Sequence, residues 1–134
     1  MANLIAVEGI GPVYAQKLKE AGIGSTDALL AAGATPQGRQ DIAAKTGIGD
    51  SLILRWVNHV DLFRIKGVGE EYSDLLEAAG VDTVVELAQR VPANLYAKLV
   101  EVNLAEKRVR RLPRAAQVKD WIKQAKKLPR KISY

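Results

Sequence analysis

The stretch VEGIGPVYAQKL (residues 7–18) places one apolar residue between two glycines and then begins a helical pattern with a proline. The same Gly-apolar-Gly arrangement, without the proline, returns in IKGVGEEYSDLL (residues 65–76) and, more loosely, in KTGIGDSLILRW (residues 45–56). Glycine adopts positive φ without steric cost, and proline suits the first position of a helix. Each stretch therefore predicts an abrupt turn that leads directly into a helix.

A shift of 58 residues aligns the two halves of the chain. The matched pairs are Leu4/Leu62, Gly9/Gly67, Gly11/Gly69, Tyr14/Tyr72, Leu18/Leu76, Ala21/Ala79, Gly22/Gly80 and Leu29/Leu87. Glycines that recur at a fixed offset indicate a duplicated unit. A shift of 56 then carries GIGD (47–50) onto NLAE (103–106), so the second unit is expected to lack the glycines of its second turn. We predict a first unit at residues 1–60 and a degenerate second unit at residues 61–134.

Each unit has the pattern of short helices. Apolar residues recur on one helical face at Leu52, Ile53, Trp56, Val57 and Val60, and again at Val118, Trp121, Ile122, Ala125 and Leu128. Thr35 before Pro36 predicts a helix start, Thr83 with Glu86 predicts a capping box, and Gly22 and Gly80 predict helix ends. No alternating strand pattern is found. The predicted fold class is all-α.

The glycine turns resemble helix-hairpin-helix motifs, whose pattern ends in a small residue four positions after the second glycine. Here the pattern is Val7–Gly11 with Ala15, and Ile65–Gly69 with Ser73. The combined pattern also resembles a bacterial family known only as domain of unknown function 4332. The helix-hairpin-helix resemblance implies non-specific DNA binding through backbone amides. The corresponding residues are Gly9, Ile10, Gly11, Val13, Gly47, Ile48, Gly49, Ser51, Gly67 and Gly69.

Acidic residues at the turns support a different interpretation. Glu70 and Glu71 follow Gly69 directly, and Asp50 follows Gly49. Carboxylates stabilise the positive end of a helix dipole but repel a phosphate. The turns are therefore either phosphate-binding sites or purely structural corners, and the residue types alone are compatible with both.

Positive charge is concentrated at one end of the chain. The net charge is +5, yet residues 107–134 contain eleven basic residues against Asp120 alone. The candidate contacts in this segment are Lys107, Arg108, Arg110, Arg111, Arg114, Lys119 and Lys123. Such a cluster suits a phosphate backbone, an acidic protein or an anionic membrane, or it is a solvated face. Because the apolar face of the last helix is committed to the core, the membrane alternative is disfavoured.

Catalytic and cofactor chemistry is not indicated by the residue types present. The chain has no cysteine, a single histidine (His59, expected on the surface), and no Gly-Lys-Ser/Thr phosphate loop. We predict no enzyme activity, metal, cofactor or small-molecule substrate. The absence of a signal-peptide pattern and of a membrane-spanning run predicts a cytoplasmic protein. The predicted function is non-enzymatic nucleic-acid binding, with DNA preferred over RNA, and the alternative is a protein-interaction scaffold.

Overall fold

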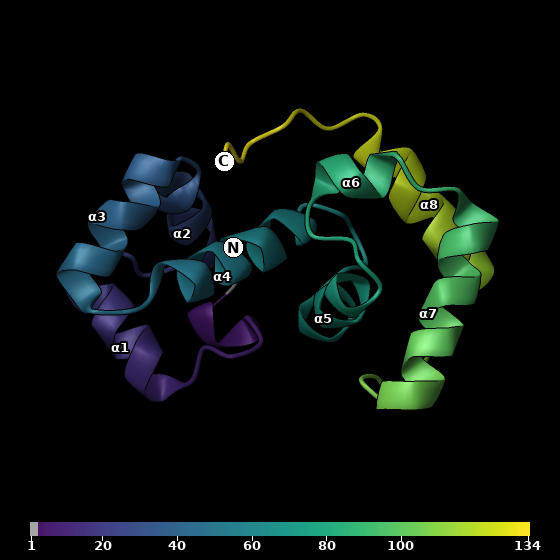
Figure 1. Ribbon diagram of the computed structural model, residues 1–134, viewed down its shortest axis with the longest axis horizontal. Coiled ribbons are helices and arrows are strands. Elements are labelled where there is room, and N and C mark those ends of the chain that lie inside the picture. The colour runs from purple at the N-terminus through teal and green to yellow at the C-terminus, as the bar shows by residue number, and fades with distance from the viewer. Residues whose placement is uncertain (1–2) are drawn as a thin grey trace. The chain divides into compact units, whose positions relative to one another are not determined.

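The computed structural model describes residues 3–134, and throughout this range the regular secondary structure is helical (Figure 1). The elements are η1 (Leu4–Ala6), α1 (Pro12–Glu20), α2 (Thr26–Gly33), α3 (Pro36–Thr46), α4 (Asp50–Leu62), α5 (Glu70–Ala78), α6 (Val84–Ala88), α7 (Pro92–Glu106) and α8 (Ala115–Ala125). The prediction of an all-α fold is confirmed.

The chain divides into two compact units. Unit 1 consists of two segments, the chain up to Asp61 and Lys131–Tyr134. Unit 2 is Leu62–Arg130. The predicted second unit, residues 61–134, includes these last four residues. They group with unit 1, where the Ser133 N–H donates a hydrogen bond of 2.8 Å to the carbonyl of Ala34.

The first glycine turn is built identically in both units. In unit 1 the N–H of Val7 donates to Leu4 O (3.1 Å) and that of Ile10 donates to Val7 O (3.0 Å). In unit 2 the equivalent bonds, from Ile65 to Leu62 and from Val68 to Ile65, are both 3.1 Å long. All six of these apolar residues are buried. The 58-residue repeat in the sequence is therefore also a repeat of backbone hydrogen bonds and core positions.

Two requirements select glycine at the first position of this turn. Gly9 and Gly67 have φ values of 94° and 97°, which L side chains rarely adopt. A Cβ atom at Gly9 would also lie 3.2 Å from Trp56 Nε1, and one at Gly67 would lie 3.1 Å from Trp121 Nε1. Each buried tryptophan, on the last long helix of its unit, thus packs against the backbone of the first turn.

The first long helix of each unit ends in the same way. Gly22 and Gly80 have positive φ, and the residue after each glycine donates a backbone hydrogen bond to the helix. The Ile23 N–H donates to Leu18 O and the Val81 N–H donates to Leu76 O, each at 2.9 Å. With the N–H of each glycine bonded to the carbonyl three residues earlier, this is a Schellman C-cap. The predicted helix ends at these glycines are therefore present.

The second turn of unit 2 differs from the sequence-based alignment. NLAE (103–106) was aligned with the turn GIGD, but these four residues complete α7, which reverses only at Lys107. Lys107 has φ 50° and ψ 48°, and its N–H donates to Asn103 O, as the N–H of Gly47 donates to Ala43 O in unit 1. No glycine interrupts NLAE, so the helix continues until a cap closes it.

Two side-chain expectations also need revision. His59 was expected on the surface but is fully buried, as are all the α4 residues from position 56 to position 62. Thr83 precedes α6 as predicted, and its hydroxyl donates to Glu86 Oε1 (3.0 Å) instead of accepting from the helix backbone. Glu86 accepts the Asp82 N–H through its other oxygen (2.9 Å), so its carboxylate bonds both the Thr83 hydroxyl and the backbone before the helix.

Candidate functional site

The first turn of unit 1 presents open backbone at the start of α1. Gly9 and Ile10 are committed to the fold, since Ile10 is buried. Gly11 is the N-cap of α1 with an extended conformation, Pro12 follows it, and a Cβ at Gly11 would meet no atom within 4 Å. The first N–H groups of a helix have no intrahelical acceptor. Val13, which is 69% exposed, carries one such N–H at this surface.

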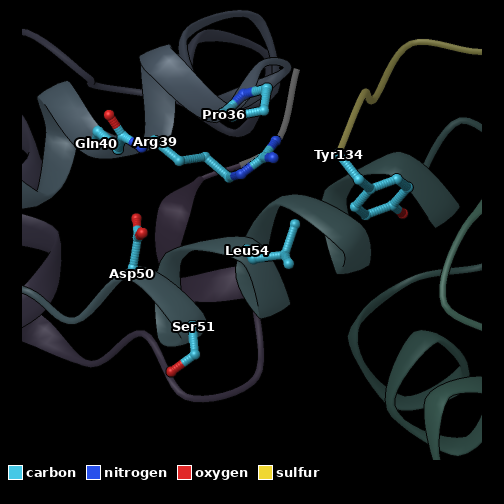
Figure 2. Close-up of a pocket in the computed structure, with 7 residues that line it drawn as sticks. All are labelled: Pro36, Arg39, Gln40, Asp50, Ser51, Leu54 and Tyr134. Atoms are coloured by element: carbon cyan, nitrogen blue, oxygen red, sulfur yellow. The ribbon is translucent and has the colours of Figure 1, made fainter.

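The second turn of unit 1 connects α3 to α4. Gly47 has φ 73° and caps α3, Ile48 is buried, and a Cβ at Gly49 would meet open space. Asp50 begins α4, so a carboxylate lies in its first turn. Figure 2 shows Asp50 and Ser51 on α4 among the residues that line a cleft of about 400 Å³ in unit 1. The cleft therefore contains an acidic group beside the proposed amide donor of Ser51.

The first turn of unit 2 has the same backbone, but two acidic residues follow it. Gly69 is the N-cap of α5, and a Cβ there would meet nothing within 4 Å. Glu70 and Glu71 form the exposed first turn of α5. Two carboxylates at this position complement the helix dipole and repel an incoming phosphate. Of the predicted turn sites, only the one at Gly11 has no acidic residue in the first turn of its helix.

The side chain of Gln124 fixes this turn of unit 2 to α8. Its Oε1 accepts the Lys66 N–H (2.8 Å) and its Nε2 donates to Lys66 O (3.1 Å), so one amide bridges both backbone groups of one residue. Gln124 Nε2 also donates to Asp120 Oδ2 at 2.8 Å. The sequence reasoning missed Gln124, because a polar residue on an exposed helix gives no signal of a contact 58 positions away.

A row of lysines lies on the outer face of α8. Trp121 is buried, whereas Lys119, Lys123 and Lys126 are exposed and lie on the opposite face at 3.6 residues per turn. Within the described residues, none of these three ammonium groups has a carboxylate partner. This row is therefore a surface of uncompensated positive charge on an ordered helix.

The loop before α8 is held in place by unit 2. Asn103 bonds Val109 twice, accepting its N–H at Oδ1 (2.9 Å) and donating from Nδ2 to its carbonyl (3.2 Å). The Tyr72 hydroxyl donates to Arg111 O over 3.0 Å. The exposed side chains of Arg110, Arg111 and Arg114 thus project from a fixed backbone.

Arg108 is exposed as well, but it differs from these three arginines in being ion-paired. Its guanidinium forms ion pairs of 2.9 Å with Asp74 on α5 and with Glu106 at the end of α7. Hydrogen bonds to Glu106 and Asp74 raise the pKa of Arg108 above its ordinary value. A guanidinium that already bridges two carboxylates is a structural cross-link, so this geometry favours the other predicted cations over Arg108 as phosphate contacts.

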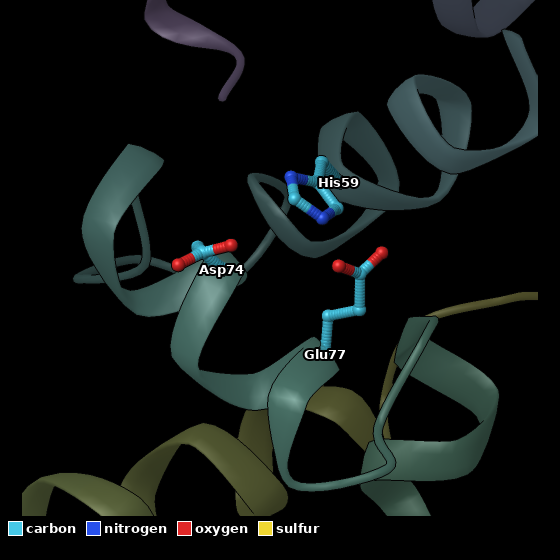
Figure 3. A group of neighbouring side chains, drawn as sticks. All are labelled: His59, Asp74 and Glu77. Atoms are coloured by element: carbon cyan, nitrogen blue, oxygen red, sulfur yellow. The ribbon is translucent and has the colours of Figure 1, made fainter. Parts of the chain in front are cut away.

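Figure 3 shows the single histidine and two acidic residues in their helices. His59 lies on α4 in unit 1, and Asp74 and Glu77 lie one turn apart on α5 in unit 2. Asp74 is 9% exposed and accepts the hydrogen bond from Arg108. Through this bond Asp74 helps to hold the loop that follows α7.

The described part of the chain contains no helix of the length and apolar character that crossing a membrane requires. Its geometry defines an all-α protein with two related units, each opening with a glycine turn locked by a buried tryptophan. Residues 8–128 match the family described as Domain of unknown function (DUF4332), and the chain belongs to this family. No curated protein and no solved structure matches the sequence.

Proposed function

We propose that this protein binds nucleic acid through the phosphate backbone, preferring duplex DNA to RNA and performing no catalysis. The observation that carries the proposal is the lysine row on α8, together with the exposed Arg110, Arg111 and Arg114 on the adjoining loop. Clustered cations on ordered backbone release condensed counterions when they meet a phosphate array. The net positive charge of the whole chain favours the same class of partner.

The dimensions of the lysine row suit a nucleic-acid backbone. Lys119 and Lys126 are seven residues apart, which is about 10 Å along a helix. Duplex DNA carries one phosphate charge per about 1.7 Å of its axis, so roughly six charges lie within that length. Phosphate contacts carry no base information, and binding is therefore expected to be independent of sequence.

The glycine at position 11 supports a second, smaller contribution from the first turn. The first glycine of the turn, Gly9, is required by its positive φ and by Trp56. Gly11 has φ −92° and open space around its Cβ position, so neither backbone conformation nor packing requires glycine there. What glycine does provide is unobstructed access to the amides at the start of α1. We propose that the turn acts as a helix-hairpin-helix phosphate contact through the N–H of Val13.

A salt titration tests the electrostatic part of the proposal. Binding of a labelled duplex is measured by fluorescence anisotropy between about 50 and 200 mM salt for the wild type and for the triple variant Lys119→Gln, Lys123→Gln, Lys126→Gln. If each lysine neutralises one phosphate, the slope of log K against log salt is negative and its magnitude decreases by roughly 3 in the triple variant.

Three exposed lysines of unit 1 provide a control of equal net charge. The variant Lys17→Gln, Lys19→Gln, Lys45→Gln removes the same charge from a different surface, and its slope is expected to stay close to that of the wild type. Equal slopes for both triple variants would refute the α8 site. Parallel titrations with single-stranded DNA and RNA test the preference for duplex.

A protein-interaction scaffold is the second candidate function, and the exposed acids Glu70 and Glu71 at the start of α5 favour it. In that case the basic surface of unit 2 would bind an acidic protein. If the protein binds neither duplex DNA, single-stranded DNA nor RNA at low salt, nucleic-acid binding is excluded and the scaffold function is retained.

A further inference from the structure

Residues 131–134 pack on unit 1 as an extended segment without regular secondary structure. Ile132 is 2% exposed, and we call this buried apolar side chain the anchor of the segment. The Ser133 N–H donates to Ala34 O over 2.8 Å, and the Tyr134 hydroxyl lies 3.4 Å from Asn58 Oδ1. Four residues therefore combine side-chain burial with hydrogen bonds from both backbone and side chain.

The surface that receives this segment is the end of α2. The last carbonyls of a helix lack intrahelical donors. Arg39 Nη1 donates to Gly33 O over 2.9 Å, and Ser133 supplies the donor for Ala34 O. We call the set Gly33, Ala34, Arg39 and Asn58 the tail groove. The segment thus completes the hydrogen bonding of a helix end that belongs to another part of the chain.

Arg39 is the main recognition residue of the tail groove. It is only 6% exposed, and its Nη2 donates to Ser133 O over 2.8 Å. Its Cζ lies 5.9 Å from the centre of the Tyr134 ring, within the range of a cation–π interaction. Figure 2 shows the Arg39 side chain extending toward Tyr134. Both backbone groups of Ser133 are therefore bonded in the groove, independently of the serine side chain.

The segment can leave the groove without disrupting a helix. Helix α8 ends at Ala125, and Leu128–Lys131 contains no regular secondary structure before Ile132. The residues leading into the segment, up to Arg130, belong to unit 2. An identical segment from another molecule would make the same contacts, which is the basis of segment exchange between copies.

We propose that the tail groove is a docking site for an extended Ile-Ser-Tyr segment, and that the partner it accepts is residues 131–134 of a second copy of this chain. The chain's own segment has the advantage of high local concentration. Docking between molecules therefore develops at high protein concentration or once the chain's own segment is displaced. This inference does not rest on nucleic-acid binding, because none of the groove residues is a proposed phosphate contact.

A peptide titration tests the groove directly. The probe is the fluorescently labelled peptide of residues 128–134, added to a variant that ends at Arg130. Saturable binding is expected, and binding to the full chain is expected to be about tenfold weaker or less, because its groove is already filled. If the folded truncated variant does not bind the peptide at about 1 mM, the proposal is wrong.

Variant peptides distinguish recognition of the peptide backbone from non-specific binding. Ser133→Pro removes the N–H that bonds Ala34 and is expected to weaken binding about tenfold or more. Ser133→Ala keeps that N–H and loses only a 3.4 Å hydroxyl contact, so it is expected to bind like the wild-type peptide. Ile132→Asp removes the apolar anchor and is expected not to bind. Equal binding of the Pro and Ala peptides would overturn the assigned mode.

A cross-linking experiment covers the case in which truncation unfolds the protein. Tyr134 is 59% exposed, so a benzophenone amino acid can replace it in the otherwise complete chain. Irradiation of dilute protein is expected to cross-link residue 134 within its own chain near Asn58. At about 1 mM, covalent dimers linked at the same site are expected. Folded protein that forms no covalent dimer at this concentration would refute exchange between copies.

Discussion

Replacing Gly67 by alanine tests the packing of the glycine turn against the tryptophan. At φ 97° an L residue suffers a conformational cost of about 1–2 kcal/mol, and the new Cβ would lie 3.1 Å from Trp121 Nε1. Relieving that contact requires movement of a buried side chain, at a cost of about 1–3 kcal/mol. The alanine also restricts the unfolded chain, which offsets about 0.5–1 kcal/mol. The expected net loss of unfolding free energy is about 1–4.5 kcal/mol.

Gly69→Ala is the matched control two residues away in the same turn. Its φ is −121° and its Cβ position is open, so only the smaller effects on N-cap preference and chain entropy remain, within about 1 kcal/mol. Both variants are compared by urea unfolding, followed by far-ultraviolet circular dichroism and tryptophan fluorescence.

A double-mutant cycle separates backbone strain from steric contact. Trp121→Phe removes the Nε1 atom, so Gly67→Ala is expected to cost about 1 kcal/mol less in that background. If Gly67→Ala costs no more than Gly69→Ala in the wild type, both parts of the reasoning are wrong. If the cost is large but unchanged by Trp121→Phe, the strain lies in the backbone alone.

Three further changes test other parts of the structure. Gly11→Val is expected to change the unfolding free energy by no more than about 1 kcal/mol and to weaken duplex binding about threefold or more. The control Gly69→Val lies beside two glutamates and is expected to leave binding unchanged. Equal duplex affinities of the two variants in a titration would exclude the first turn of unit 1 as a contact. Lys107→Gly relieves a left-handed backbone and is expected to stabilise the protein by about 1 kcal/mol in urea unfolding, and Lys107→Ala, which keeps the strain, is not. Asp74→Asn removes a charged partner of Arg108 and is expected to lower the unfolding free energy by about 1–2 kcal/mol. The amide hydrogen of Val109 is expected to exchange faster in this variant. Exchange as slow as in the wild type would show that the ion pair does not hold the loop.

The glycine turns and the helix ends were predictable because their causes are local. A residue at positive φ is nearly always glycine, so Gly9, Gly22 and their counterparts 58 positions later mark the turns directly in the sequence. Helix periodicity likewise predicted the buried faces that carry both tryptophans. These features depend on a few neighbouring residues and on backbone sterics.

The features that sequence reasoning missed depend on contacts distant in the chain. Arg108 pairs with Asp74, 34 positions earlier, and Arg39 bonds Ser133, 94 positions later. From the sequence alone both arginines are expected to be ordinary exposed cations, and only the folded structure identifies their partners. The reversal at Lys107 was missed for another reason: a lysine occupies a conformation that favours glycine, so the usual residue signal is absent.

The two glycines of the repeated turn therefore have different roles. The first is required by the fold, because its backbone conformation and a tryptophan indole both exclude a side chain. The second has an ordinary φ and open space around it in both units, so the fold does not require it. Helix α5 begins with two glutamates after this glycine, whereas the first turn of α1 has no acidic residue. If the second glycine provides access for a phosphate, only the unit 1 turn is suited to that role, and the cations of unit 2 must supply the remaining attraction from α8 and its preceding loop.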